Sequence, residues 1–467
     1  MKIRYYSHAS YQIITASGKR LLADPWVYNP ISNNLWQFPE CPIDADTYLD
    51  QDYLYISHNH VDHYCVDTLE HFRRDIPIII RQYGMLNNPM KPTLQRMGFT
   101  NFIEIEHKET VTIEGDLKIT LYADLNTTDS AIVIDDGEHK LFHQNDCMMS
   151  NEDAAHIGEN FDIDVALLGL VNSSIYPTFF EMNVDDKMRI AGEISQKILK
   201  RTCDYGVLTG AKAIIPCASD MVFLSLPETD KYIGPTLLDL PGYVEENNLP
   251  FRVLTPKPGE YLDLHAMPDY MEPIYTSRQE MEEQISALRA RGDVRGVFKE
   301  VEQWMDRFVF NKEVFDKLLF DYVEHIQNNF EETFAKQLPN LNDVKPYKIV
   351  WAVADGVKKH GYALTFDFQK HTADVAHIPY SLEVGDDTAM ILEMDAWGLQ
   401  SIIEGAMSFE DIRGGSMNMH RPGPFCTEEV VFWDTMLLFR VWLENNGLVV
   451  QSKNTPPTRI SSVFRNS

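Results

Sequence analysis

The residues best suited to chemistry follow a predicted strand near residue 55 and read H-x-H-x-D-H. They are His58, His60, Asp62 and His63. Three imidazoles and a carboxylate within six residues are donor types that zinc, iron and manganese accept. A loop leaving a strand end can turn all four side chains toward one point, which a continuous helix or strand cannot do. The spacing therefore predicts a transition-metal site, against the plainer interpretation of a solvated polar turn.

This run resembles the signature of the metallo-β-lactamase superfamily, and two other segments carry the same resemblance. Ala23-Asp24-Pro25-Trp26 closes a predicted strand in the manner of one branch of that superfamily. The segment Leu141–Asp146 is similar to its later strand-to-aspartate element, whose aspartate bridges two metals. The resemblance thus implies that Asp146 is a fifth ligand, with a turn or N-cap role as the plain alternative.

Two histidines that the superfamily pattern expects are absent from this chain. The loop Tyr122–Asp129 and the segment Ile215–Asp220 contain none. Oxygen ligands could replace them, and such ligands favour iron or manganese over zinc. The candidates are Asp124, Asn126, Asp129 and Asp220. We therefore expect one or two transition-metal ions, with iron favoured and zinc or manganese as alternatives.

Three residues outside the run are candidates for roles around the metal. His8 ends the first predicted strand in Ser7-His8-Ala9-Ser10 and is expected beside the site as a supporting residue rather than a ligand. Asp24 could hold the distal N–H of a ligand histidine, as carboxylates behind metal ligands do. Asp62 and His143 are the catalytic candidates, and a core histidine is the equal alternative for His143.

Size and composition limit the class of protein. At 467 residues the chain is longer than one core usually supports, so two domains are expected. The formal net charge of −29 argues against a nucleic-acid partner, which needs a basic surface. No apolar run reaches the length of a membrane span. The absence of a signal-peptide pattern and six scattered cysteines predict a cytoplasmic protein.

The predicted elements divide the chain into 1–265 and 266–467. The first part alternates strands and helices, with one helix over about 185–201, and this α/β pattern fits an αββα metallo-β-lactamase sandwich. The second part is expected to be α+β, with helices over about 276–291 and 297–335 and a small sheet. Its segment Ala396–Asp411 resembles a sterol-carrier-like domain, with an ordinary amphipathic helix as the alternative.

Details within 1–265 resemble one family more closely, the CMP-N-acetylneuraminate hydroxylases. The matching segments include Thr128–Ile134, Asn145–Cys147 and Leu254–Gly259. The ascorbate-6-phosphate lactonase branch shares the D-P-W and metal elements but matches less well. The hydroxylase family also carries a Rieske iron–sulfur domain, which needs Cys₂His₂ ligation. This chain has no C-x-H or C-x-x-H pair, so an O₂ reaction would need an external electron donor or electrons from the substrate.

Three functions follow from these expectations. The favoured one is an iron-dependent oxygenase or oxidase acting on a small molecule. The alternative is a metal-dependent hydrolase of a lactone, amide or phosphodiester, in which Asp62 orients a metal-bound water. The third is a metal-binding module without catalysis.

Overall fold

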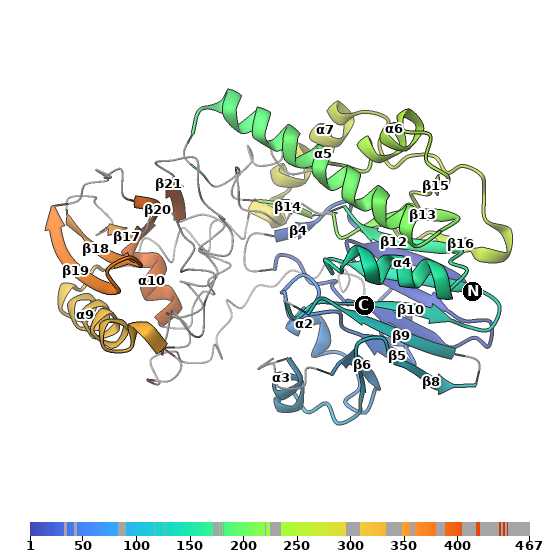
Figure 1. Cartoon of the computed structure of the whole chain (residues 1–467), viewed down its shortest axis with the longest axis horizontal. Helices are drawn as coiled ribbons and strands as arrows, with labels where there is room; N and C mark the ends of the chain where they lie inside the picture. Colours follow the sequence, from blue (N-terminus) through green and yellow to red (C-terminus); the bar gives the residue numbers. More distant parts are fainter. Residues whose placement is uncertain are drawn as a thin grey trace.

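The structure is a computed structural model of the whole chain (Figure 1). It describes residues 1–31, 35–41, 44–82, 90–115, 117–125, 127–170, 177, 180, 182–219, 221–224, 235–295, 309–332, 348–354, 360–379, 388–403, 417–420, 439, 442, 443 and 446.

A seven-stranded sheet begins the chain, in the order β16-β1-β2-β3-β5-β6-β7. Its strands are β1 Lys2–Ser7, β2 Ser10–Ile14, β3 Arg20–Ala23, β5 Tyr53–Tyr55, β6 Ile78–Arg81, β7 Phe102–Ile105 and β16 Tyr261–Asp263. The strands from β16 to β3 pair antiparallel, and those from β3 to β7 pair parallel. Strands β3 and β5 therefore end at the same edge, which brings Asp24 next to the loop after β5.

A second seven-stranded sheet has the order β15-β13-β12-β11-β10-β9-β8. Its strands are β8 Thr110–Glu114, β9 Leu117–Ala123, β10 Ser130–Asp135, β11 Lys140–Asn145, β12 Val165–Gly169, β13 Ala213–Cys217 and β15 Arg252–Val253. Strands β8 to β11 pair antiparallel, and β11 to β15 pair parallel. The carboxyl ends of β11, β12 and β13 thus meet at one edge, as parallel pairing requires.

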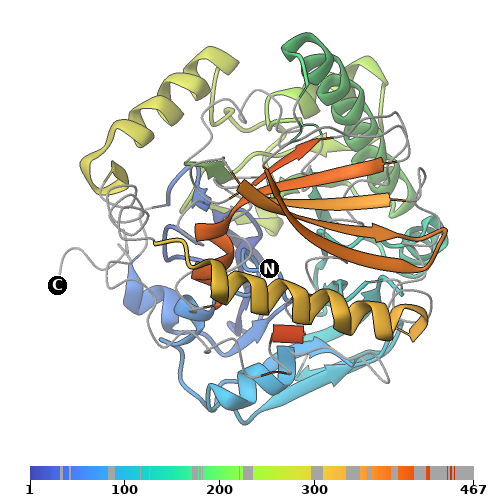
Figure 2. The same cartoon turned by 90° about the vertical axis from the view of Figure 1, so that its left-hand side faces the viewer.

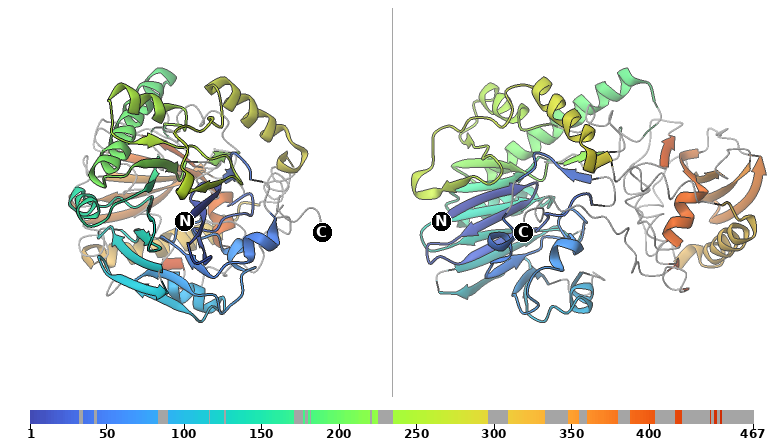
Figure 3. Two further views of the ribbon diagram at one scale, coloured as in Figure 1. Left: turned by 90° about the vertical axis from the view of Figure 1, so that its right-hand side faces the viewer. Right: turned by 180° about the vertical axis from the view of Figure 1, so that it is seen from behind.

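The two sheets stack face to face between their helices (Figures 1 and 3). Alternate side chains point to opposite faces of a strand, so each strand contributes to an inner and an outer core. The inner core packs residues such as Tyr11 and Tyr55 against Ile132 and Leu167. The outer cores pack α1 Ala45–Leu49, α2 Val66–Leu69 and α3 Met90–Arg96 on the first sheet, and α4 Asn151–Asn160, α5 Val184–Leu208 and α6 Asp239–Glu246 on the second. The predicted αββα sandwich is confirmed.

A smaller layer flanks the sandwich. Strands β4 Leu35–Gln37 and β14 Met221–Phe223 pair antiparallel, and helix α7 Arg278–Ala290 packs Met281 and Ile285 in one cluster with Trp36 of β4. The short 3₁₀ helix η2 Leu264–Ala266 lies between β16 and α7 in the sequence. Helix α7 confirms the predicted helix over 276–291. Its apolar face packs against residues of the first part of the chain, such as Trp36. The boundary near residue 266 stays a prediction.

The later part of the chain forms a five-stranded sheet of order β19-β18-β17-β20-β21. Its elements are α9 Lys312–Asn328, β17 Lys348–Ala354, β18 His360–Asp367, β19 Thr372–Pro379, β20 Thr388–Asp395, α10 Ala396–Ile403 and β21 Met417–His420. Helix α9 lies along the sheet (Figure 2), with Tyr322 stacked on Trp351 of β17. This α+β arrangement agrees with the expected class, and the sterol-carrier likeness stays a prediction. Residues 296–308, within the second predicted helix, lie outside the described residues.

Within the described residues, no helix combines the length and apolarity needed to cross a membrane. The five cysteines that the structure describes are all buried free thiols, and Cys426 lies outside the described residues.

Candidate metal centre

The H-x-H-x-D-H run leaves the first sheet where β5 ends. Strand β5 and Ile56 are buried, which fixes the start of the run in the core. The backbone then turns tightly, because the N–H groups of His63 and Tyr64 both donate to the carbonyl of His60. This turn returns His63 toward His58, so both side chains are buried at the same edge of the sandwich. His60, at the apex of the turn, is exposed.

Asp24 anchors two imidazoles of the run from behind. Its Oδ2 lies 2.9 Å from Nδ1 of His63 and accepts the hydroxyl hydrogen of Ser57 at 2.7 Å. The Ser57 Oγ lies 2.9 Å from Nδ1 of His58, and the Ser57 backbone N–H donates to Asp24 Oδ1 at 2.8 Å. These contacts direct Nδ1 of both rings toward Ser57 and Asp24 and leave both Nε2 atoms facing away from Asp24, as in metal-ligating histidines.

One cluster of ligand atoms contains His58, His63 and Asp146, whose donor atoms all lie within 4.8 Å of one another. The Nε2 of His63 is 3.3 Å from Oδ2 of Asp146. The Nε2 of His58 is 2.8 Å from Nδ1 of His60, which brings a third imidazole next to this cluster. Among the described residues, neither His63 Nε2 nor Asp146 Oδ1 has a hydrogen-bond partner although both atoms are buried.

Asp146 is positioned by a strained turn at the end of β11. Asn145 adopts a φ of 49°, and its Oδ1 accepts from the backbone N–H groups of Asp146 and Cys147 at 2.6 and 3.3 Å. Its Nδ2 donates to the Ser130 carbonyl, and the Ser130 hydroxyl donates to the Ser57 carbonyl. A chain of polar contacts thus ties the end of β11 to the start of the metal run.

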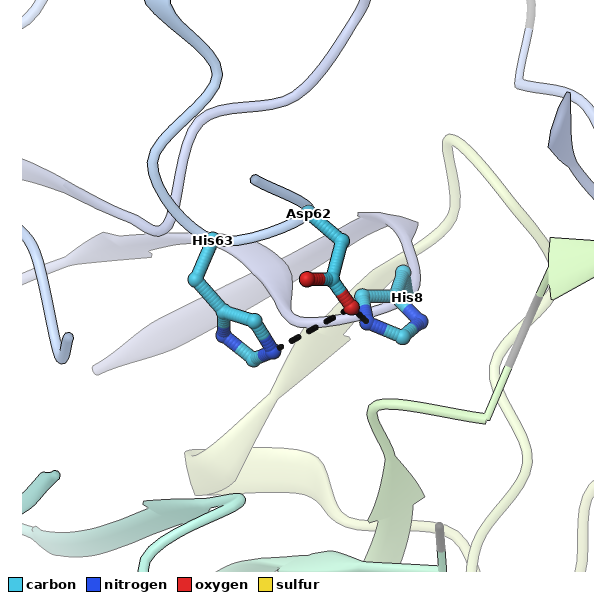
Figure 4. A group of neighbouring side chains, drawn as sticks. All are labelled: His8, Asp62 and His63. Carbon is cyan, nitrogen blue, oxygen red and sulfur yellow. Dashed lines mark hydrogen bonds and ion pairs between the residues drawn. The ribbon is translucent and has the colours of Figure 1, made fainter. Parts of the chain in front are cut away.

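A second cluster contains His8, Asp62 and His63 (Figure 4). The Nε2 of His8 lies 3.1 Å from Asp62 Oδ2, and the Nε2 of His63 lies 3.8 Å from the same oxygen. His8 comes from the turn between β1 and β2, 54 positions before Asp62, and is 1% exposed. The two clusters share His63, so this imidazole lies between them.

At His63 and Asp62 the neighbouring charges outweigh the effect of burial on the pKa. Burial lowers the pKa of His63, but the carboxylates of Asp146, Asp62 and Asp24 outweigh it and raise that pKa well above the usual histidine value. Burial raises the pKa of Asp62, but His63 and His8 outweigh it and hold that pKa well below the usual range. Burial, reinforced by His63 and His60, lowers the pKa of His58. Carboxylates and a cationic imidazole thus face one another without full hydrogen bonding.

The spacings of these atoms fit a bound transition metal. Two donors at about 2.1 Å from one ion, with angles of about 90–110° between them, lie roughly 3.0–3.4 Å apart. The Asp146–His63 separation of 3.3 Å falls in this range, as does the hydrogen-bonded Asp62–His8 pair at 3.1 Å, whereas the Asp62–His63 separation of 3.8 Å lies outside it. The chemistry of the donors, imidazole and carboxylate, suits zinc, iron or manganese. The described residues therefore fit the metal ions that the sequence predicts.

The loop that lacks the expected histidine is held close to this site. The Arg81 guanidinium donates to the carbonyls of Asp124, Thr127 and Asp129 at 2.7, 2.8 and 3.2 Å. The side chains of Asp124 and Asp129 are buried. Burial and the Asp146 carboxylate raise the pKa of Asp129, and His60 lowers it. The resulting pKa is about 6. Of the four predicted oxygen ligands, Asn126 and Asp220 lie outside the described residues.

His143 lies behind the site rather than in it. It is fully buried on β11, with the Tyr11 and Tyr55 rings packed edge-on at 5.9 and 6.1 Å. Neither ring nitrogen hydrogen-bonds a described residue, and burial lowers the pKa of His143 to about 4. These surroundings favour the core interpretation, and a catalytic role for His143 stays a prediction.

The structure brings together His58, His60, Asp62, His63 and Asp146 from the predicted set. It also confirms that Asp24 holds the distal ring nitrogen of a histidine of the run. Sequence reasoning missed Ser57, which links Asp24 to His58. Its position directly before the run, at a strand end next to Asp24, could have indicated this role.

Comparisons with known proteins agree with this fold. Residues 2–197 match a family model described as "Beta-lactamase superfamily domain". A protein of Mycobacterium tuberculosis named as a Rieske 2Fe-2S iron-sulfur protein is 30% identical over 239 residues, 48% of this chain and 45% of that protein. Cytidine monophosphate-N-acetylneuraminic acid hydroxylase of Danio rerio is 25% identical over 279 residues, 56% of this chain and 46% of the hydroxylase.

The chain spans less than half the length of these two relatives. Among solved structures, a metallo hydrolase of Ignicoccus hospitalis aligns with a TM-score of 0.40 and 18% identity, covering 56% of this chain and 97% of that one. The family match and the two stacked sheets agree: residues 2–197 are similar to the β-lactamase superfamily domain, and the two sheets with their helices have the metallo-β-lactamase αββα fold.

Proposed function

We propose that the chain is a metal-dependent enzyme acting on a small molecule, and that it is an iron-dependent oxygenase or oxidase. The carrying observation is the composition of the two ligand clusters. Each consists of two imidazoles and one carboxylate: His58, His63 and Asp146 in one, and His8, Asp62 and His63 in the other. Two histidines and one carboxylate with open positions are the donor set of non-haem iron(II) oxygenases.

The loop beside the first cluster supports the preference for iron. Where the superfamily pattern expects a histidine, the chain holds buried Asp124 and Asp129. Carboxylate donors shift metal preference away from zinc and toward iron or manganese. A relative named as a hydroxylase matches the same half of the chain.

In this proposal the protein binds and orients the substrate and excludes water from the site, and the metal ion supplies the chemistry that activates O₂. Asp24 and Ser57 hold the imidazoles of His63 and His58 so that each offers Nε2. Asp62, kept ionised by its neighbours His63 and His8, supplies negative charge beside the reacting centre. In this proposal the electrons come from a separate donor or from the substrate.

Metal content and O₂ uptake test this proposal. Protein purified without chelator should contain near-stoichiometric iron, and reduced protein should consume O₂. The His63→Ala variant should lose both, whereas His265→Ala, an exposed histidine outside the site, should keep both. Zinc in place of iron together with turnover of an ester or lactone would overturn the oxygenase assignment, and a protein without metal would point to a non-catalytic module.

A metal-dependent hydrolase is the second candidate, and Asp62 favours it. Its half-buried, ionised carboxylate stands beside two imidazoles, where it could orient a metal-activated water toward an ester, lactone or phosphodiester. Turnover of an ester probe without O₂ uptake by the wild type would support this candidate, and Asp62→Asn should then abolish the hydrolysis.

A further inference from the structure

Two histidines meet at the end of the sandwich that lies away from the H-x-H-x-D-H run. His139 directly precedes β11 and Asp146 directly follows it, so about 20 Å separate them at the rise of a strand. We propose that His139 and His265, which follows β16, form a separate two-imidazole site for a divalent transition-metal ion such as Cu²⁺ or Zn²⁺. This inference does not rest on the proposed function, because neither residue belongs to the candidate metal centre.

The facing nitrogens of the two rings have the separation of two donors on one ion. Nε2 of His139 lies 3.2 Å from Nδ1 of His265, although the residues are 126 positions apart. Donors at about 2.1 Å from a shared ion lie roughly 3.0–3.4 Å apart. The rings stand edge to face, with centroids 4.5 Å apart and an angle of 75° between their planes. They therefore do not stack, and their polar contact is made by the two nitrogens.

A carboxylate stands behind each ring. Nδ1 of His139 lies 3.2 Å from Asp164 Oδ2, and Nε2 of His265 lies 3.2 Å from Glu138 Oε2. An ionised carboxylate only accepts hydrogen bonds, so each contact is favourable when the ring nitrogen facing it carries the hydrogen. In neutral rings both facing nitrogens then hold lone pairs, which repel each other unless a cation lies between them. Carboxylates behind the histidine ligands are typical of metal sites.

Asp164 is the firmer of the two anchors. Its Oδ1 accepts from Lys212 Nζ at 2.8 Å, and its Oδ2 accepts from the Lys140 backbone N–H at 3.0 Å. Burial raises the pKa of Asp164, but these hydrogen bonds outweigh burial and hold that pKa below its usual value. The His139 side chain beside it is 15% exposed, whereas that of His265 is 56% exposed. His139 thus provides the fixed half of the site, and His265 provides the half that solvent reaches.

The backbone of each histidine is also held in place. The His139 N–H donates to Asp136 Oδ1 within the β10–β11 turn at 2.8 Å. The His265 N–H donates to Asp263 Oδ1 at the start of η2 at 3.1 Å. Strand β16 belongs to the first sheet, and β10 and β11 belong to the second. An ion bound by both imidazoles therefore links the two sheets at this end of the sandwich.

The donor type decides which ions the site retains. Imidazole suits copper, nickel and zinc, and the affinity of such donors rises from Fe²⁺ to Cu²⁺. Two imidazoles should release Fe²⁺ when loose metal is removed, so His265→Ala leaves the iron of the metal centre unchanged. Cu²⁺ is the probe that this site should hold most tightly.

Titration of the protein with Cu²⁺, with its metal centre as purified, tests the inference. The wild type should bind one ion more than His265→Ala or His139→Gln, and the EPR spectrum of this ion should show coupling to two nitrogens. Asp164→Asn should bind the same ion about 10–100-fold more weakly, because the anchor behind His139 loses its charge. His325→Ala, at an exposed histidine of α9, is the matched control and should bind as many ions as the wild type.

The outcomes decide between a metal site and a plain contact of two rings. Equal Cu²⁺ binding by the wild type and His265→Ala would show that the rings only share a hydrogen bond, and the inference would be wrong. The proposed enzyme would stand, because its ligands are the same in both proteins. Without added metal, the Tm of His265→Ala should match that of the wild type, which shows that the variant is folded. Added Cu²⁺ should raise the Tm of the wild type more than that of His265→Ala, because the ion binds only the folded chain. An equal rise would also contradict the site.

Discussion

The Oδ2 of Asp24 lies 2.9 Å from Nδ1 of His63, and both side chains are completely buried. Asp24 itself sits in the left-handed region, with a φ of 41°, at the end of β3. The parallel pairing of β3 with β5 brings this strand end beside the run, and the Asp24 backbone N–H donates to the Tyr55 carbonyl. One carboxylate thus sets the orientation of an imidazole that belongs to both ligand clusters.

Replacing Asp24 with Asn should weaken metal binding without unfolding the chain. Asn keeps the shape and tolerates positive φ, but it has no charge to hold the ring N–H of His63. The metal affinity should fall about 10–100-fold, measured by competition with a chromophoric chelator. Asp162→Asn, at an exposed aspartate paired with Lys212, is the matched control and should bind as the wild type does. Unchanged affinity in Asp24→Asn would contradict the orienting role.

Gly169, at the end of β12, should tolerate no side chain. A Cβ at this position would lie 2.3 Å from the Asn145 carbonyl oxygen, directly before Asp146. Gly169→Ala should therefore displace the end of β11, destabilise the protein by about 1–3 kcal/mol and reduce metal affinity. Gly192→Ala in α5 is the control, because its Cβ would meet nothing within 4 Å; it should be neutral or slightly stabilising in urea unfolding. Equal stability of the two variants would show that the β11–β12 contact is not tight.

The buried His143 should make the stability of the metal-free protein depend on pH. Its pKa is lowered to about 4 when folded, against 6.5 as the ordinary value, so the unfolded chain takes up a proton first as pH falls. Folding stability is therefore lost between about pH 6.5 and pH 4. From pH 7.5 to pH 5 the wild type should lose roughly 2 kcal/mol more than His143→Phe does in urea unfolding. Parallel pH profiles of the two proteins would contradict this environment for His143.

Phe180 should couple the two parts of the chain. It follows the second sheet's β12 in sequence, yet it is buried in the core of the later sheet with residues such as Leu319 and Trp351. Phe180→Ala should cost about 3–5 kcal/mol, as truncation of a buried phenylalanine does. Differential scanning calorimetry should show the loss in the transition of the later part. A variant that melts like the wild type would show that burial of Phe180 in the later core contributes little to stability.

The centre could be predicted from the sequence because its ligand types are crowded at one strand end. Residues His58 to His63 lie on a short loop, and their convergence needs only the end of β5. Asp24 and Asp146 could be placed for a similar reason, since each ends a strand whose resemblance to a known element was readable. The αββα sandwich followed from alternating strands and helices.

The remaining features depend on contacts between segments distant in sequence. His8 and Ala218 are neighbours only because β1 and the end of β13 meet across the sandwich. The packing of α7 against Trp36 and of Phe180 in the later core likewise joins residues more than a hundred positions apart. Local pattern cannot reveal such pairs, so the contact between His8 and the segment after β13 could not be predicted.

The number of ions bound by His63→Ala is the most direct test of the account. His63 is the one residue that both ligand clusters share among the described residues. After anaerobic reconstitution with Fe²⁺ and removal of loose metal, the wild type should retain iron, and His63→Ala should retain none, while His265→Ala matches the wild type. A His63→Ala protein that is folded and holds as much iron as the wild type would contradict a metal centre at this edge of the sandwich.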